Sequence, residues 1–465
     1  MIVRGVWVHL LLGAAMAVVV IGINAPEGGL DPFPEYAERI VTGGIPYRDY
    51  PFEYPPLALF PLAMPRLLAG ANDYIPAFAV LSFVFAVATT IAVGLVARRG
   101  WSGAGNGTTA ETGLVFGGLA LAALPLILFR FDIFAAMFAA LALLAVAFRR
   151  PGWVGAALGF GALVKIFPAF LLPVVFLYYV FNRERTAAVH LVAGFVVSTA
   201  AVLAEVAIYA GPRQTLAWLT YQDRRGVEIE SIHGSLAMLG DVLGGPASTI
   251  TFGFGSYEVT SALLDPLGVP LLLLGVTLVV GVIAGALASF RHDVRRLGRV
   301  QVSTLVTYLT ATVLLIIVTN KVLSPQYMVW LFPFAPLLRL RHSLTLLVAQ
   351  LLTTIEYPLA FADLRALDPK LVWLVNLRNA ILIGLLIWLI VPGLALLRPR
   401  RGQTQGQSVA MLEMPPRSPA ETPNMSNPMA SRLRCGAIRV RSSAAKVTVA
   451  TLARVRPGRP SSLAR

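Results

Sequence analysis

Carboxylates, arginines and tyrosines are concentrated in the loop between the first two apolar stretches of the chain, residues 24–73. Only 13% of the chain is charged, yet this loop is rich in ionisable groups. Its ionisable side chains include Glu27, Asp31, Glu35, Arg39, Arg48, Asp49 and Glu53. Partial burial and a nearby arginine can tune the pKa of a carboxylate at a membrane boundary, which suits it to act as a general base. The sequence therefore predicts that chemistry takes place in this loop.

Asp31 and Glu35 stand four residues apart at the entry of a short helix predicted over 33–42. On a helix this spacing places both carboxylates on one face, and Gly43-Gly44 is typical of a helix end. Glu35 has an ordinary alternative role, since an exposed acidic group near a helix N-terminus interacts favourably with the helix dipole.

The remainder of the loop is predicted to form a rigid turn. Its glycines supply unusual backbone angles, and Pro46 fixes the direction in which the chain leaves. Arg48 lies next to Asp49, which favours a structural ion pair within the loop. The residues predicted to bind an acceptor or to shape the loop are Glu35, Tyr36, Tyr47, Arg48, Asp49, Glu53 and Tyr54.

Basic side chains later in the chain are candidates to bind a phosphate group. Arg130 lies near Asp132 between two apolar spans, where a pair of snorkelling surface side chains is the alternative. Lys165 is flanked by apolar sequence and is predicted either to neutralise a lipid phosphate or to snorkel. Arg224 and Arg225 stand beside acidic residues and suit bidentate contact with a phosphate or a sugar carboxylate. A plain salt-bridge cluster explains these two arginines equally well.

Asn320-Lys321 and Ser324-Pro325-Gln326-Tyr327 interrupt an otherwise continuous apolar run. Such breaks are tolerated in membrane proteins where the backbone lines a cavity. We therefore predict that Lys321 contacts phosphate and that Gln326 and Tyr327 contact the acceptor or shape the site.

The composition indicates that the elements that position these residues span a membrane. The 465 residues are 57% hydrophobic with a mean hydropathy of +0.74, and the apolar runs are long enough to cross a hydrocarbon core of about 30 Å. The sequence predicts an all-α polytopic membrane protein of about twelve transmembrane helices. The expected spans are 6–23, 74–97, 113–129, 131–148, 152–164, 167–181, 187–210, 266–290, 301–319, 324–339, 343–361 and 372–397.

Lysines and arginines in short loops mark the cytoplasmic side. When the expected spans alternate, the short basic clusters fall on one side, and both termini are then cytoplasmic. The loops 24–73 and 211–265 fall on the other side together with the candidate site residues. The Pro-rich apolar segment 55–70 is predicted to lie along the membrane as an interfacial helix. The protein is thus expected in the cell membrane with an extracytoplasmic site.

The net charge of +15 resides mainly in residues 398–465, which carry thirteen basic and two acidic side chains. This segment is predicted to be a disordered, basic cytoplasmic tail that follows a membrane domain over 1–397. No aromatic residues are interleaved with its arginines, so binding to nucleic acid is not expected. The single cysteine, Cys435, lies in the tail and excludes an intramolecular disulfide.

Several other motifs carry no chemistry. The five histidines have no ligand spacing, so neither a metal nor another cofactor is expected. Gly159-Phe160-Gly161 before Lys165 lacks the spacing of a phosphate-binding loop. Gly155 and Gly159 instead predict a face for close helix packing.

The loop motifs together resemble bacterial glycosyltransferase family 87. The resemblance is carried by Asp31, Tyr36, Gly43–Asp49 and Glu53–Pro56, with weaker matches at Arg130–Asp132, Lys165 with Phe167-Pro168, and Asn320–Tyr327. It covers roughly residues 6–397 and implies the GT-C architecture of polytopic enzymes that use a sugar linked to polyprenyl phosphate. The family includes α-1,2-mannosyltransferases, and the resemblance implies that Asp31 is the catalytic base.

The expected function is transfer of a hexose, with mannose the leading candidate, to an extracytoplasmic lipid or glycan acceptor. Asp31 would take a proton from the acceptor hydroxyl, and fixed cations would stabilise the departing phosphate. A single displacement of this kind inverts the anomeric centre. A lipid or sugar transporter, or flippase, without transferase chemistry is the main alternative, and a non-catalytic envelope scaffold is a third. No internal repeat typical of transporters is seen.

Overall fold

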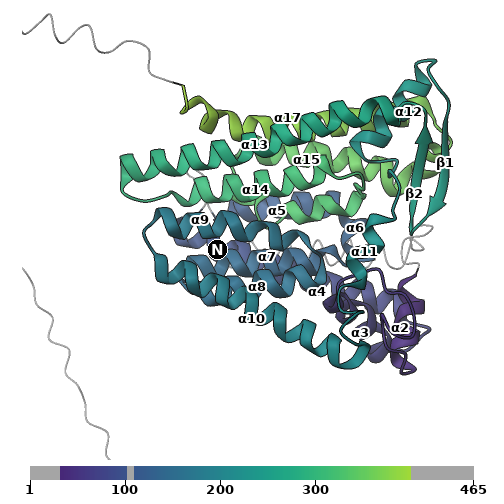
Figure 1. The fold of residues 1–465 in the computed structure, drawn as a ribbon, viewed down its shortest axis with the longest axis horizontal. Coiled ribbons are helices and arrows are strands. Elements are labelled where there is room, and N and C mark those ends of the chain that lie inside the picture. The colour runs from purple at the N-terminus through teal and green to yellow at the C-terminus, as the bar shows by residue number, and fades with distance from the viewer. Residues whose placement is uncertain (1–31, 102–108, 399–465) are drawn as a thin grey trace, which may run out of the picture. The chain divides into compact units, whose positions relative to one another are not determined.

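The computed structural model describes residues 32–101 and 109–398. The expected first span 6–23, the catalytic candidate Asp31 and the predicted tail lie outside the described residues, apart from Arg398 at the start of the tail. Within the described part the chain is mainly helical, with one two-stranded antiparallel hairpin (Figure 1). This agrees with the predicted helical membrane protein.

Five of the described helices are long and apolar enough to cross a membrane, with mean hydropathies between 2.1 and 2.6. They are α4 (Tyr74–Val96), α10 (Arg185–Ala210), α13 (Leu264–Leu297), α14 (Val302–Thr319) and α17 (Pro369–Ala395). Many of their apolar side chains point outward, and Ile208 of α10 is 79% exposed. Apolar residues on the outside of a helical bundle fit a hydrocarbon solvent, and these helices therefore indicate an integral membrane protein.

Shorter helices and helical turns lie between the five long helices along the chain or pack against them. They are α5 (Thr109–Ala122), α6 (Leu124–Phe129), α7 (Asp132–Ala147), α8 (Pro151–Val164), α9 (Leu172–Phe181), α15 (Leu340–Thr354), α16 (Phe361–Arg365), η2 (Ala97–Trp101), η3 (Phe167–Leu171) and η6 (Ile355–Leu359). Several expected spans are thus divided. Span 113–129 is interrupted at Ala123, and span 343–361 is interrupted by η6, which contains Pro358.

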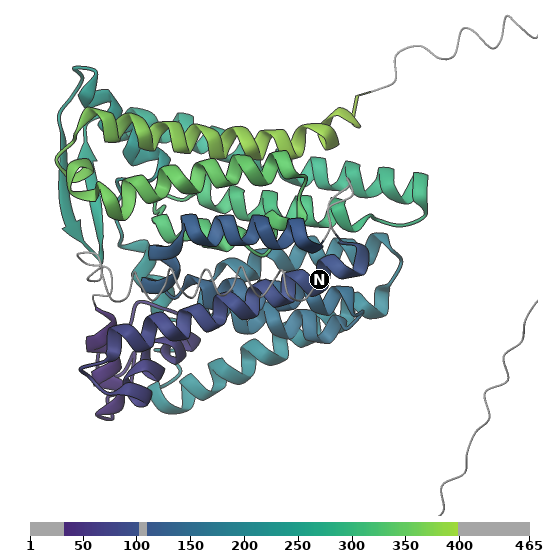
Figure 2. The same cartoon turned by 180° about the vertical axis from the view of Figure 1, so that it is seen from behind.

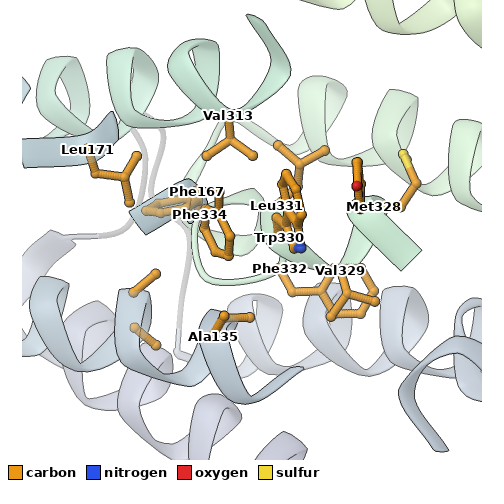
Figure 3. Packing of buried hydrophobic residues seen from close by; sticks show 14 of the residues in the cluster. Ala135, Phe167, Leu171, Val313, Met328, Val329, Trp330, Leu331, Phe332 and Phe334 are labelled. Atoms are coloured by element: carbon orange, nitrogen blue, oxygen red, sulfur yellow. The ribbon is translucent and has the colours of Figure 1, made fainter. Parts of the chain in front are cut away.

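The expected span 324–339 is not an α-helix. It forms two 3₁₀ segments, η4 (Pro325–Leu331) and η5 (Ala335–Leu337), because Pro325, Pro333 and Pro336 cannot donate backbone hydrogen bonds. Figure 3 shows residues of this segment packed against Ala135 of α7, Phe167 and Leu171 of η3, and Val313 of α14. Protein therefore covers this irregular backbone, as the membrane requires. The count of about twelve spans stays a prediction.

The connections with the most polar side chains gather at one end of the helices (Figures 1 and 2). They contain α2 (Phe33–Val41), η1 (Pro56–Ala58), α3 (Leu59–Ala69), α11 (Ala217–Asp223), α12 (Ile232–Val242), β1 (Ser248–Gly253) and β2 (Ser256–Ser261). The strands pair with Gly253 opposite Ser256, a hairpin that sequence analysis did not predict. A helix does form within 55–70, as expected, and its position along a membrane surface stays a prediction.

Close packing of α8 on α10 depends on glycine. A Cβ at Gly155 would lie 1.9 Å from the Leu191 carbonyl oxygen, and one at Gly159 would lie 2.2 Å from Ser198 Oγ. On the facing helix, a Cβ at Gly194 would lie 2.1 Å from the Gly152 carbonyl oxygen. The predicted packing face at Gly155 and Gly159 is therefore confirmed.

Candidate functional site

Lys165 is surrounded by residues from three distant parts of the chain. Its ammonium lies 4.5 Å from the ring centre of Phe131, 5.2 Å from that of Tyr54 and 5.9 Å from that of Tyr327. Asp132 Oδ2 is 3.6 Å from Lys165 Nζ. We call Tyr54, Phe131, Asp132, Lys165, Tyr327 and Trp330 the Lys165 cluster.

The ends of two helices position this pair. Helix α8 ends at Val164, and Lys165 takes an extended backbone conformation before η3 begins. Helix α6 ends at Phe129, Arg130 has an extended backbone, and helix α7 begins at Asp132. The side chain of Asp132 is 1% exposed and that of Lys165 is 14% exposed. A buried carboxylate requires such a counter-charge, because desolvation strongly disfavours an isolated ion.

Trp330 completes the surroundings of Asp132. Its indole Nε1 donates a hydrogen bond of 2.7 Å to Asp132 Oδ1. The indole ring is stacked between Tyr327, at a centroid distance of 4.0 Å, and Phe167, at 4.7 Å. Figure 3 shows the Trp330 and Phe167 rings together in the core. The aromatic stack thus fixes the direction from which the hydrogen bond reaches Asp132.

Arg225 and Glu228 form a second charged pair beside the Lys165 cluster. Arg225 Nη2 lies 3.9 Å from Glu228 Oε1, which also accepts a 2.7 Å hydrogen bond from the Ser324 hydroxyl. Burial raises the pKa of the Glu228 carboxyl, although Arg225 and the Ser324 hydrogen bond oppose the shift. Arg225 is close enough to Lys165 for the two positive charges to repel. The positive charges therefore converge here, each with a carboxylate nearby.

Arg130 belongs to the same region. It donates a 2.9 Å hydrogen bond to the hydroxyl of Tyr357. It is also close enough to Lys165 for the two positive charges to repel. The snorkelling surface pair, which was the alternative for Arg130 and Asp132, does not fit Asp132, because the side chain of Asp132 is buried and is bound by Lys165 and Trp330.

A fully buried ion pair lies deeper in the protein. Arg378 of α17 lies 3.4 Å from Glu356 of η6, and neither side chain is exposed. Arg378 also donates to the main-chain carbonyl oxygen of Glu230. Burial, followed by the negative charges of Glu228 and Glu356, raises the pKa of the Glu230 carboxyl well above its usual range. These groups extend the polar region from the site into the helices.

Glu53 of the first loop faces two tyrosines at the same end of the protein. The hydroxyls of Tyr54 and Tyr221 lie against its carboxylate, and burial together with this negative charge raises the pKa of both tyrosines. A Cβ at Gly255 would lie 3.5 Å from Glu53 Oε2. The turn of the β1–β2 hairpin therefore reaches the buried Glu53.

The turn of the first loop is held mainly by its own side chains. Gly43 has a φ of +90° and Tyr47 one of +67°, and the Tyr47 hydroxyl donates a 2.6 Å hydrogen bond to the Tyr54 carbonyl oxygen. Arg48 and Asp49 form an exposed ion pair of 2.8 Å. This bond and the Ile45 backbone N–H lower the pKa of the Asp49 carboxyl. The turn thus contains the loop ion pair expected from the sequence.

The sequence model of glycosyltransferase family 87 matches residues 52–319 of the chain. The chain belongs to glycosyltransferase family 87. A comparison with curated proteins finds no match. The predicted resemblance is confirmed, and family 87 membership makes the chain a glycosyltransferase. The family match includes Glu53, Tyr54, Arg130, Lys165 and the two arginines after α11.

The structure brings only some of the predicted site residues of this family 87 enzyme together. Tyr54, Arg130, Lys165, Arg225 and Tyr327 converge as described above. The side chains of Arg224 and Lys321 are exposed, and the Lys321 carbonyl oxygen accepts the Glu228 backbone N–H. Gln326 Oε1 is buried without a hydrogen-bond partner among the described residues.

The predicted residues of α2 differ in their surroundings. Glu35 forms an exposed ion pair of 2.6 Å with Arg39. Tyr36 instead packs on aromatic rings, with its ring centre 5.0 Å from that of Phe52, and burial is the main cause that raises its pKa. Glu35 therefore faces water while Tyr36 faces the interior.

Sequence reasoning missed Trp330, Glu356 and Arg378 as members of this polar region, and it noted Glu228 only as one of the acidic residues near Arg224 and Arg225. A signal was present for two of them, because Glu356 and Arg378 are charges inside expected apolar spans, where ionisable residues are rare and usually paired. No such signal marks Trp330. Among the residues that the structure describes, no group of three or more potential metal ligands is found.

Proposed function

We propose that this family 87 glycosyltransferase moves a hexose, with mannose the leading candidate, from a polyprenyl-phosphate donor to a lipid or glycan acceptor. The reaction takes place on the extracytoplasmic side of the cell membrane, at the end of the bundle that carries α2, α11 and the hairpin. The observation that carries this proposal is the convergence of Arg130, Lys165 and Arg225 beside the first loop.

The donor phosphate lies against these three cations, with Arg224 and Lys321 at the solvent edge. The acceptor oxygen attacks the anomeric carbon, and the bond from that carbon to the phosphate oxygen breaks. The phosphate leaves with an additional negative charge, which the cations stabilise more strongly than they stabilise the bound donor. Asp31 accepts the proton of the acceptor hydroxyl. Attack from the side opposite the phosphate inverts the anomeric configuration.

The first loop binds or positions the acceptor in this proposal. Tyr36, Tyr54 and Glu53 are the side chains that line the inner face of the loop, whereas Glu35, Tyr47, Arg48 and Asp49 maintain its shape. Family membership favours transfer chemistry over the transporter alternative.

Reconstituted protein with radiolabelled polyprenyl-phosphate mannose and membrane lipid acceptors tests the proposal. We expect transfer by the wild type and a loss of about 10²–10⁴-fold in Asp31→Asn, the range typical of a lost general base. Glu38→Gln is the control, because Glu38 is a carboxylate of α2 that pairs with Arg66 at 2.7 Å. Normal transfer by Asp31→Asn would remove Asp31 from the mechanism. NMR of the product determines whether the configuration is inverted.

A further inference from the structure

The Lys165 ammonium has unused hydrogen-bonding capacity. Among the residues that the structure describes, its nearest carboxylate oxygen is 3.6 Å away, beyond the usual range of an N–H···O hydrogen bond. The structure gives it no hydrogen bond to any residue in 32–101 or 109–398. Three aromatic rings surround the Lys165 ammonium. Unlike a carboxylate, the rings do not accept conventional hydrogen bonds from its N–H groups. The Lys165 side chain is 14% exposed, so it is not completely sealed from solvent.

Asp132 is held back from closing on Lys165 by its other oxygen. Oδ1 accepts the 2.7 Å hydrogen bond from Trp330 Nε1. Trp330 cannot follow a movement of Asp132, because its ring is stacked on Tyr327 on one side and on Phe167 on the other. The backbone of Asp132 is fixed at the start of α7. One oxygen of the Asp132 carboxylate therefore accepts a hydrogen bond from the neutral Trp330 indole, while the other oxygen faces the more distant Lys165 ammonium.

We propose that Trp330 is a positioning residue that keeps the Lys165 ammonium available to the phosphate of the ligand. Without the indole N–H, the buried Asp132 carboxylate would lose a partner and turn towards Lys165. A phosphate would then compete with a direct carboxylate–ammonium hydrogen bond. The inference rests on the proposed function, because it takes Lys165 to be a phosphate ligand.

Binding of a short-chain polyprenyl phosphate to the full chain in nanodiscs tests this role without catalysis. We expect Trp330→Phe, which keeps an aromatic ring but lacks the N–H, to raise the Kd about tenfold, as expected for loss of a hydrogen bond to a charged group. Phe167→Leu is the matched control, because it alters the same stack but leaves the indole N–H in place. Its Kd should change by no more than about twofold.

A second comparison separates positioning from packing. In a Lys165→Met background, Trp330→Phe should cause no further loss of affinity, since the residue acts through Lys165. Three results would each overturn the proposal. The first is that Trp330→Phe lowers the affinity equally with and without Lys165. The others are that Trp330→Phe and Phe167→Leu lower the affinity equally, or that Trp330→Phe keeps the wild-type affinity. Trp330→His keeps a ring N–H donor and should bind more tightly than Trp330→Phe. If the Phe variant does not fold, equal affinity in Trp330→His and the wild type supports the role, and affinity as weak as that of Lys165→Met opposes it.

The Lys165→Met variant alone tests the phosphate role. Wild-type affinity in this variant would remove Lys165 from the phosphate site of the proposed function. If Lys165→Met weakens binding and Trp330→Phe does not, the phosphate site stands and only the positioning role is lost.

Discussion

Glu230 is a carboxyl group that the fold buries among other negative charges. It is 2% exposed, and Glu228 and Glu356 both act on it together with the opposing charge of Arg378. Its raised pKa means that the folded protein holds a proton that the unfolded chain releases once the pH exceeds the ordinary value of 4.5. The unfolded state then binds fewer protons, so stability falls as the pH rises through this range.

Glu230→Gln should remove this contribution to the pH dependence. We expect the free energy of unfolding of the wild type to fall between pH 5 and pH 8. In Glu230→Gln this fall should be smaller by about 1–3 kcal/mol, the scale of one unfavourable buried group. Thermal unfolding in nanodiscs at several pH values measures the difference. Glu35→Gln, at an exposed ion pair, should keep the wild-type slope. Parallel curves for Glu230→Gln and wild type would contradict the assignment.

The residues of the site were only partly predictable. Lys165 and Arg225 stand out in the sequence because a charge is unusual in apolar surroundings or outside the cytoplasmic loops. Their partners do not stand out. The Lys165–Asp132 and Trp330–Asp132 contacts join segments that are far apart along the chain, and hydropathy contains no information on which ends of helices meet. Asp31 rests on the family resemblance alone.

At the scale of elements, the α8–α10 pair gives the sharpest prediction. Gly155→Ala should be strongly destabilising, because its Cβ would lie 1.9 Å from the Leu191 carbonyl oxygen, a backbone atom that cannot rotate away. Gly152→Ala on the same helix should be tolerated, since its Cβ would meet nothing nearer than 3.9 Å.

The two alanine variants should differ by about 1–3 kcal/mol, the usual penalty for overpacking. Thermal unfolding of the purified proteins in one detergent compares them directly, because both changes remove a helical glycine and add one methyl group. Equal stability of the two variants would show that α8 and α10 are not in backbone contact.

The long helices were predictable because a membrane imposes one simple requirement on them, which is length in an apolar run. Thus α4, α10, α13, α14 and α17 agree with the expected spans to within several residues. The same criterion failed at 324–339, where prolines replace the helix by 3₁₀ turns. It also gave no indication of the β1–β2 hairpin, which makes tertiary contacts such as the hydrogen bond from the Gly226 N–H to Glu258 Oε1.

At the scale of the whole molecule, α13 connects the two ends of the bundle. It runs from Leu264, just after the hairpin, to Leu297, and its 34 residues span about 50 Å at 1.5 Å per residue. This exceeds a hydrocarbon core of about 30 Å, so its ends lie on opposite sides of a membrane that it crosses.

Cysteine labelling should therefore distinguish the two ends. In a Cys435→Ala background, which removes the single cysteine, the exposed Thr249 of β1 and Arg296 at the end of α13 are each replaced by cysteine. We expect Thr249→Cys to react with a membrane-impermeant maleimide in intact cells, and Arg296→Cys to react only after permeabilisation. The reverse pattern would place the Lys165 cluster on the cytoplasmic side and exclude the proposed extracytoplasmic reaction.

Because of Arg378, the last two hydrophobic segments should depend on each other during biogenesis. An arginine near the middle of a helix opposes its release from the translocon into lipid by about 2.5–3.5 kcal/mol. In the folded protein this charge faces Glu356 at 3.4 Å, on the hydrophobic segment formed by α15 and η6, which the short helix α16 separates from α17. α17 would therefore leave the protein-conducting channel most readily as a pair with that segment, already joined by the ion pair.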